Sequence, residues 1–141
     1  NLTSLNLSEN QLLGDDPLNP DFTGVRTLVD AAPKQLQTFC GFEEGQTKAN
    51  LSSKNLGSGD AILLAWELTT GSVSASLTSI DLSLNDLRKD GAVAVAKALE
   101  VNASMKKLNV LKNFIGDEGY EMLTTVAEEK GILTLVGFYE G

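Results

Sequence analysis

The sequence lacks histidine altogether, and its 141 residues include one cysteine and three prolines. Without histidine the commonest general base and metal ligand of proteins is missing, so we expect no enzyme, no catalytic residue, no metal and no other cofactor. A single cysteine, Cys40, cannot form an intrachain disulfide, which favours a reducing compartment. No apolar run approaches the length of a membrane span, and no signal peptide is recognisable. We therefore expect a cytoplasmic protein that does not bind a membrane.

Positive charge is also scarce. Eleven Lys and Arg residues stand against nineteen Asp and Glu residues, and the net charge is −8. The basic residues are scattered along the chain, with short pairs at Arg88-Lys89 and Lys106-Lys107. A nucleic-acid surface needs clustered Lys and Arg side chains that neutralise phosphates, so we expect no nucleic-acid partner. The acidic balance favours solubility and would steer basic partners towards the protein.

What the sequence does contain is a recurring pattern of apolar residues. Residues 77–87 follow the spacing LxxLxLxxNxL, and the segment after Gly91 has helical periodicity. The same frame returns 28 residues later, from Met105 to Ile115, and is again followed by a glycine, Gly119. Repeats of this length are typical of solenoids, in which a unit cannot bury its own apolar face and must pack on its neighbours.

This frame resembles leucine-rich repeats of the longer, ribonuclease-inhibitor-like subclass. The resemblance implies an α/β fold: a right-handed solenoid, here a horseshoe fragment, with a parallel concave sheet and convex helices. Residues 36–65 carry the pattern LxTxCGF…GQTxANxSxxxLGxGDAILxA. It resembles repeats of uncharacterised leucine-rich-repeat proteins of marine protists and metagenomes, and this second resemblance implies no known activity.

The whole chain, residues 1–141, is predicted to be a single leucine-rich-repeat domain. Residues 13–23 are rich in Asp, Asn, Pro and Gly and are predicted to form an inserted loop in the first unit. The second and last units are predicted to be short strands without a helix. The predicted units are, in order, about 1–35, 36–45, 46–76, 77–104, 105–131 and 132–141.

The candidate binding surface follows from the alternation of side chains along a strand. Residues between the inward-facing leucines are expected on the concave face, where leucine-rich-repeat proteins commonly bind partners. Cys40 and Thr134 are expected in the same exposed rows. A solvated sheet without a partner would explain this small polar surface equally well. The predicted partner-binding residues are Ser4, Asn6, Ser8, Lys48, Asn50, Ser79, Asp81, Lys107 and Asn109.

Three asparagines, Asn10, Asn85 and Asn113, stand where the chain leaves a predicted strand. A side-chain amide there can accept from and donate to the backbone of adjacent turns, so we predict a structural asparagine ladder. In unit 46–76 the position is occupied by Lys54, which cannot accept a hydrogen bond. We expect the ladder to be interrupted at that unit.

The resulting hypothesis is a noncatalytic protein–protein interaction module that binds a protein partner on its concave face. Two alternatives stay open. The chain begins without Met and inside a repeat, which fits a fragment of a larger NLR-like sensor or GTPase-regulator array. Alternatively it is a structural, self-associating repeat protein, since exposed solenoid ends could pair two copies into a homodimer.

Overall fold

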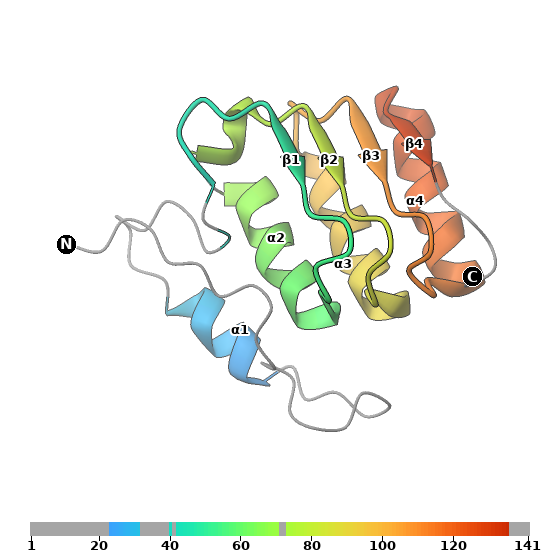
Figure 1. Cartoon of the computed structure of the whole chain (residues 1–141), viewed down its shortest axis with the longest axis horizontal. Helices are drawn as coiled ribbons and strands as arrows, with labels where there is room; N and C mark the ends of the chain where they lie inside the picture. Colours follow the sequence, from blue (N-terminus) through green and yellow to red (C-terminus); the bar gives the residue numbers. More distant parts are fainter. Residues whose placement is uncertain (1–22, 32–39, 41, 71–72, 136–141) are drawn as a thin grey trace.

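The computed structural model describes residues 23–31, 40, 42–70 and 73–135, and Figure 1 shows them coloured along the chain. The predicted site residues Ser4, Asn6, Ser8 and Asn10 lie outside the described residues, as does nearly all of the predicted loop 13–23. In chain order the elements are α1 (Thr23–Asp30), β1 (Lys48–Asn50), α2 (Ser58–Thr70), the 3₁₀ helix η1 (Val73–Ser76), β2 (Ser79–Asp81), α3 (Arg88–Val101), β3 (Lys107–Asn109), α4 (Gly116–Lys130) and β4 (Leu133–Leu135).

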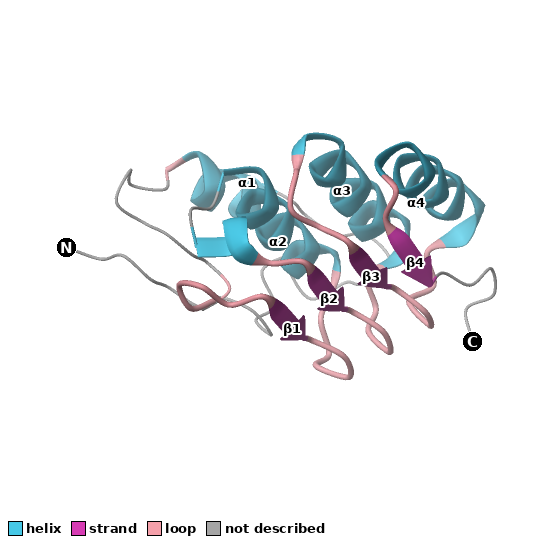
Figure 2. Ribbon diagram, turned by 90° about the horizontal axis from the view of Figure 1, so that it is seen from above, coloured by secondary structure: helices cyan, strands magenta, loops and turns pink. Residues whose placement is uncertain are grey.

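The strands form one parallel sheet in the order β1-β2-β3-β4. Parallel neighbours need a crossover connection, and α2, α3 and α4 supply one between each successive pair of strands. Figure 2 shows these helices together on one face of the sheet. The structure thus has the predicted α/β arrangement of a parallel sheet with helices on one side.

The register of the sheet keeps the inward positions aligned. Ala49, Ile80 and Leu108 lie side by side on β1, β2 and β3, and all three are buried. They join one apolar core with the helix residues Leu64, Leu99 and Leu123 and others. Each repeat therefore buries its leucines against both its own helix and the adjacent repeats.

Two glycines allow the helices to approach closely. A methyl group added at Gly91 of α3 would lie 3.2 Å from the Cβ of Ala61 on α2. One added at Gly119 of α4 would lie 2.9 Å from the Cβ of Ala92 on α3. Real Cβ atoms essentially never approach to 2.9 Å, and 3.2 Å is already tighter than most real contacts. A glycine that faces an alanine of the preceding helix therefore sets how closely neighbouring helices pack.

The predicted alignment of the last strand is wrong by one residue. Lys107 pairs with Leu133, and Thr134 pairs with the inward-facing Leu108 rather than with the exposed row. The reason lies at the end of α4, where Gly131 adopts a left-handed conformation with φ 68° and donates its N–H back to the last turn. This C-cap turns the chain directly after α4, so β4 begins only three residues after the last residue of the helix. A shift of one residue in register exchanges the two faces of a strand.

In the part of the chain that the structure describes, no helix has both the length and the apolar character needed to cross a membrane.

Candidate functional site

The face of the sheet that points away from the helices is the candidate site, and we call it the sheet face. The register aligns Lys48, Ser79 and Lys107 in one row and Asn50, Asp81 and Asn109 in the next. Lys48, Asn50 and Lys107 are exposed, while the other three side chains are partly exposed. The structure therefore brings together the six predicted partner-binding residues that it describes.

The second row of the sheet face has a local role that the sequence-based prediction missed. The Oδ1 atom of Asn50 accepts from the backbone N–H of Ser52 at 3.1 Å and from its hydroxyl at 2.6 Å. Asp81 accepts from the N–H of Ser83 at 2.9 Å and from its hydroxyl at 2.7 Å. Each carboxyl or amide oxygen thus stabilises the turn that ends its own strand.

Asn109 forms the same kind of turn, since its Oδ1 accepts from the N–H of Leu111 at 3.1 Å. The spacing of Asn or Asp two residues before Ser, as in Asn50-Leu51-Ser52, was available in the sequence as a signal for this turn. The first row differs, because Lys48 and Lys107 form no ion pair among the described residues. Lys48, Ser79 and Lys107 are therefore the positions at which contact with a partner can be tested without disturbing the strand ends.

Asn85 is a buried link between adjacent turns. Its Oδ1 accepts from the N–H groups of Lys54 and Leu56, both at 3.0 Å. Its Nδ2 donates to the carbonyls of Leu51 at 2.8 Å and Leu82 at 2.9 Å, with a longer contact to Ser83. One side chain thereby satisfies backbone groups of two successive repeats that the bends would otherwise leave unpaired.

Asn113 repeats this arrangement one unit further on. It accepts from the N–H of Leu87 at 3.2 Å and donates to the carbonyls of Leu82 at 2.8 Å and Val110 at 3.1 Å. At the equivalent position of the preceding unit, Lys54 is exposed and contributes its backbone N–H to Asn85. The amide links of the described residues thus run from Asn113 to Asn85 and reach the turn that contains Lys54.

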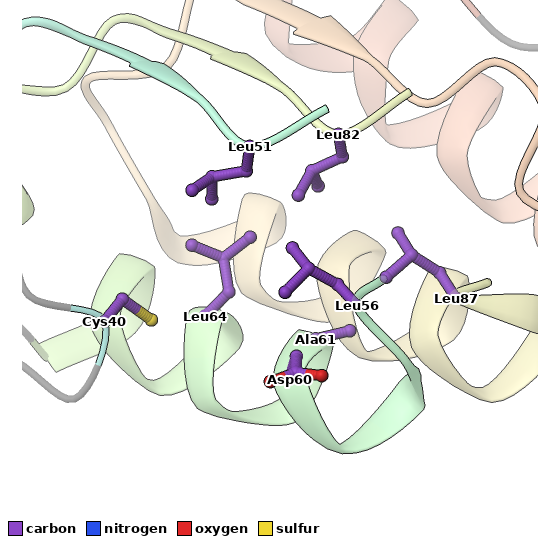
Figure 3. Close-up of a pocket in the computed structure, with 8 residues that line it drawn as sticks. All are labelled: Cys40, Leu51, Leu56, Asp60, Ala61, Leu64, Leu82 and Leu87. Carbon is purple, nitrogen blue, oxygen red and sulfur yellow. The ribbon is translucent and has the colours of Figure 1, made fainter. Parts of the chain in front are cut away.

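Cys40 does not lie in an exposed row of the sheet face, contrary to the sequence-based expectation. It packs against the apolar core and lines a cavity of about 20 Å³, together with Leu51, Leu56, Asp60, Ala61, Leu64, Leu82 and Leu87 (Figure 3). Its backbone N–H donates to the buried carboxylate of Glu67 at 2.9 Å. This contact bridges residues far apart in sequence and explains why the strand pattern alone misplaced the thiol.

The environment of Cys40 makes the thiol a poor nucleophile. Burial, followed by the nearby carboxylates of Glu67 and Asp60, raises the pKa of the Cys40 thiol well above its usual value. Less thiolate is then present at any given pH, and only the thiolate reacts. The cavity is apolar and has room for about one water molecule.

We expect Cys40 of the folded protein to react with an aromatic disulfide reagent at pH 8 at least about tenfold more slowly than in urea. The rate should rise as the pH is raised further, because deprotonation is displaced to higher pH. Stopped-flow absorbance of the released thiolate measures both rates. Equal rates in the folded and unfolded protein would show that the Cys40 thiol is not buried and that its pKa is not raised.

Among the described residues, no cluster of His, Cys, Asp and Glu side chains is arranged to hold a metal ion.

The family model of the leucine-rich repeat matches residues 1–16, 73–96 and 101–123. These matched segments identify leucine-rich repeats within the chain. The matched segments contain β2 with most of α3, and β3 with the first half of α4. They leave out β1 and α2, which the sheet register nevertheless joins to the leucine-rich repeats that follow. Leucine-rich repeats generally mediate protein–protein interaction.

Proposed function

We propose that this leucine-rich-repeat protein is a noncatalytic module that binds a protein partner through its sheet face. The observation that carries the proposal is the one-sided covering of the sheet. The helices α2, α3 and α4 lie on one face of the sheet (Figure 2). The sheet face carries exposed polar side chains. Parallel sheets are usually buried on both faces, so a face left uncovered by the described helices is a natural place for a second protein.

The finer features of the hypothesis are part of the same proposal. The repeats would be of the ribonuclease-inhibitor-like subclass and form a right-handed solenoid with a concave sheet face. They would be related to the repeats of marine protists and metagenomes. The protein would act in the cytoplasm. Nucleic acid is not the proposed partner. Two alternatives accompany this proposal. The module is part of a larger sensor or GTPase-regulator array, or it forms a homodimer through the repeat ends.

The test is affinity capture from an extract of the source cells with matched variants. Ser79→Arg combined with Lys48→Glu changes the first row of the sheet face, and neither residue takes part in the turns that end the strands. We expect this double variant to lose a captured protein by at least about tenfold, since a bulky charge placed in an interface disrupts packing and desolvation.

Lys97→Glu is the control, because Lys97 is an exposed residue of α3 on the helix side. It should capture as much partner as the unaltered protein does. The thermal melting temperature of every variant should stay unchanged, which separates lost binding from lost folding. Equal capture by the double variant and the control would overturn the sheet face as the binding site.

A further inference from the structure

The sheet face and its loops carry positive charge in a protein whose net charge is −8. Lys48 and Lys107 lie on the strands, Lys54 and Lys112 lie in the loops that follow, and all four are exposed. Asp81 is the opposing charge on the strands. Helix α4 has the opposite character, with five exposed acidic residues, Asp117, Glu118, Glu121, Glu128 and Glu129.

These four lysines are available to a partner. Among the described residues the ion pairs are Arg88 at the start of α3 with Asp86 just before it, and Lys89 of α3 with Glu118 of α4. None of the four lysines takes part in them. Lys48 and Lys107 are separated by the strand that carries Ser79, and so lie roughly 10 Å apart at the usual strand spacing. A polyproline II segment has three residues per turn and rises about 3.1 Å per residue, so carboxylates three residues apart lie on one side of it and would match this spacing.

Three apolar residues border the same surface, and the repeats themselves show that the fold does not need them. The positions of Leu84 and Phe114 are occupied by Ser53 and Asn55 in the repeat of β1, as the strand register defines. Leu111 stands where the other two described repeats have serine. Leu84 is 53% exposed and Phe114 is 56% exposed. Burial therefore does not account for the large side chains of Leu84 and Phe114.

Backbone preference does not account for them either. Leu84 and Phe114 adopt left-handed conformations, with φ of 59° and 55°. Bulky L-residues are disfavoured there, whereas Asn is tolerated, as at the equivalent Asn55 with φ 61°. Large apolar side chains at positions that are both exposed and unfavourable indicate a contact made outside the repeat.

We propose that the sheet face and its loops bind an extended acidic segment of a partner protein that also carries a large apolar side chain. This inference rests on the proposed function and adds the chemistry of the partner. Carboxylates of the segment pair with Lys48 and Lys107 across the strands. The apolar side chain packs on Leu84, Leu111 and Phe114. The overall acidity of the protein disfavours acidic partners elsewhere, so the sheet face is the part of the described surface where such a segment fits.

The experiment is a selection from a displayed library of random linear 12-residue peptides on the immobilised protein, followed by fluorescence anisotropy of the enriched peptide. Enriched peptides should be acidic and contain Leu, Phe or Trp, and their affinity should fall several-fold between 50 and 300 mM salt. Lys107→Glu should weaken binding by about tenfold, while Lys97→Glu, the same charge change on the helix side, should not.

A second variant replaces Leu84 and Leu111 with Ser and Phe114 with Asn, the residues of the β1 repeat. It should also weaken binding by about tenfold, yet melt at the same temperature or higher, because Asn suits the left-handed backbone. Equal affinity of this variant, or of Lys107→Glu, overturns the inference.

The remaining outcomes separate this inference from the proposed function. Enriched peptides without acidic residues that are blocked by Ser79→Arg overturn the inference and leave the proposed function standing. Enriched peptides that ignore both Ser79→Arg and Lys107→Glu overturn both. Failure to enrich any peptide overturns the inference. Tighter binding of a single-stranded RNA than of any peptide, unaffected by the apolar variant, overturns it in favour of a nucleic-acid surface.

Discussion

Replacing Asn85 with Ala is expected to lower the free energy of unfolding by about 3 kcal/mol. The substitution removes an acceptor for the N–H groups of Lys54 and Leu56 and a donor to the carbonyls of Leu51 and Leu82. Some of these groups are buried, and a buried backbone group left without a partner costs about 1–3 kcal/mol. Urea denaturation followed by circular dichroism measures the loss.

The controls for Asn85 use the neighbouring unit. Lys54→Ala changes an exposed side chain of the turn that Asn85 holds and should alter stability by less than about 0.5 kcal/mol. Asn85→Asp keeps an acceptor but places a second oxygen against the carbonyls of Leu51 and Leu82, so it should destabilise the protein at least as much as the alanine variant near neutral pH. An Asn85→Ala loss no larger than that of Lys54→Ala would show that the amide link does not hold the repeats together.

Replacing Leu108 with Ala is expected to cost about 3 kcal/mol, within the usual range for a leucine removed from a core. Leu108 is 1% exposed, lies on β3 between β2 and β4, and belongs to the continuous core of the repeats. The lost burial and the remaining cavity both contribute, because neighbouring strands fixed by hydrogen bonds cannot close the space. The same denaturation measurement applies.

Leu111→Ala provides the matched comparison for Leu108. It deletes the same atoms three residues later, at a partly exposed position outside the buried core. We expect it to cost less than about 1 kcal/mol, since little apolar area returns to water. Similar losses for the two variants would contradict the assignment of Leu108 to the core and Leu111 to the surface.

The residue spacing alone predicts much of the fold. The frame from Leu77 to Leu87 predicts a strand, a turn and a helix, and its return at Met105 predicts parallel stacking. The strands and helices of the structure follow this order. Prediction succeeds here because the alternation of apolar and polar residues along a strand and their periodicity along a helix are local properties that recur in each repeat.

The sequence was a poorer guide to the candidate site. Spacing places Asn50, Asp81 and Asn109 on one row, but it does not show that their oxygens are engaged by the following turns. It also misplaced Cys40, because the contact between its backbone and Glu67 joins residues far apart in the chain. Thr134 was misplaced because the C-cap at Gly131 shortens the entry to β4.

The sequence by itself determined the repeat, the class of fold and the direction in which the leucines point, because these depend on periodicities of two and of about 3.6 residues. Only the tertiary structure decided which residues meet across repeats. It set Lys48 beside Ser79 and Lys107, and it brought the buried amide of Asn85 to the turn of the preceding unit. Such contacts depend on the register between strands and on where each helix ends. A shift of a single residue changes both the register and the helix end, and no local sequence pattern specifies either.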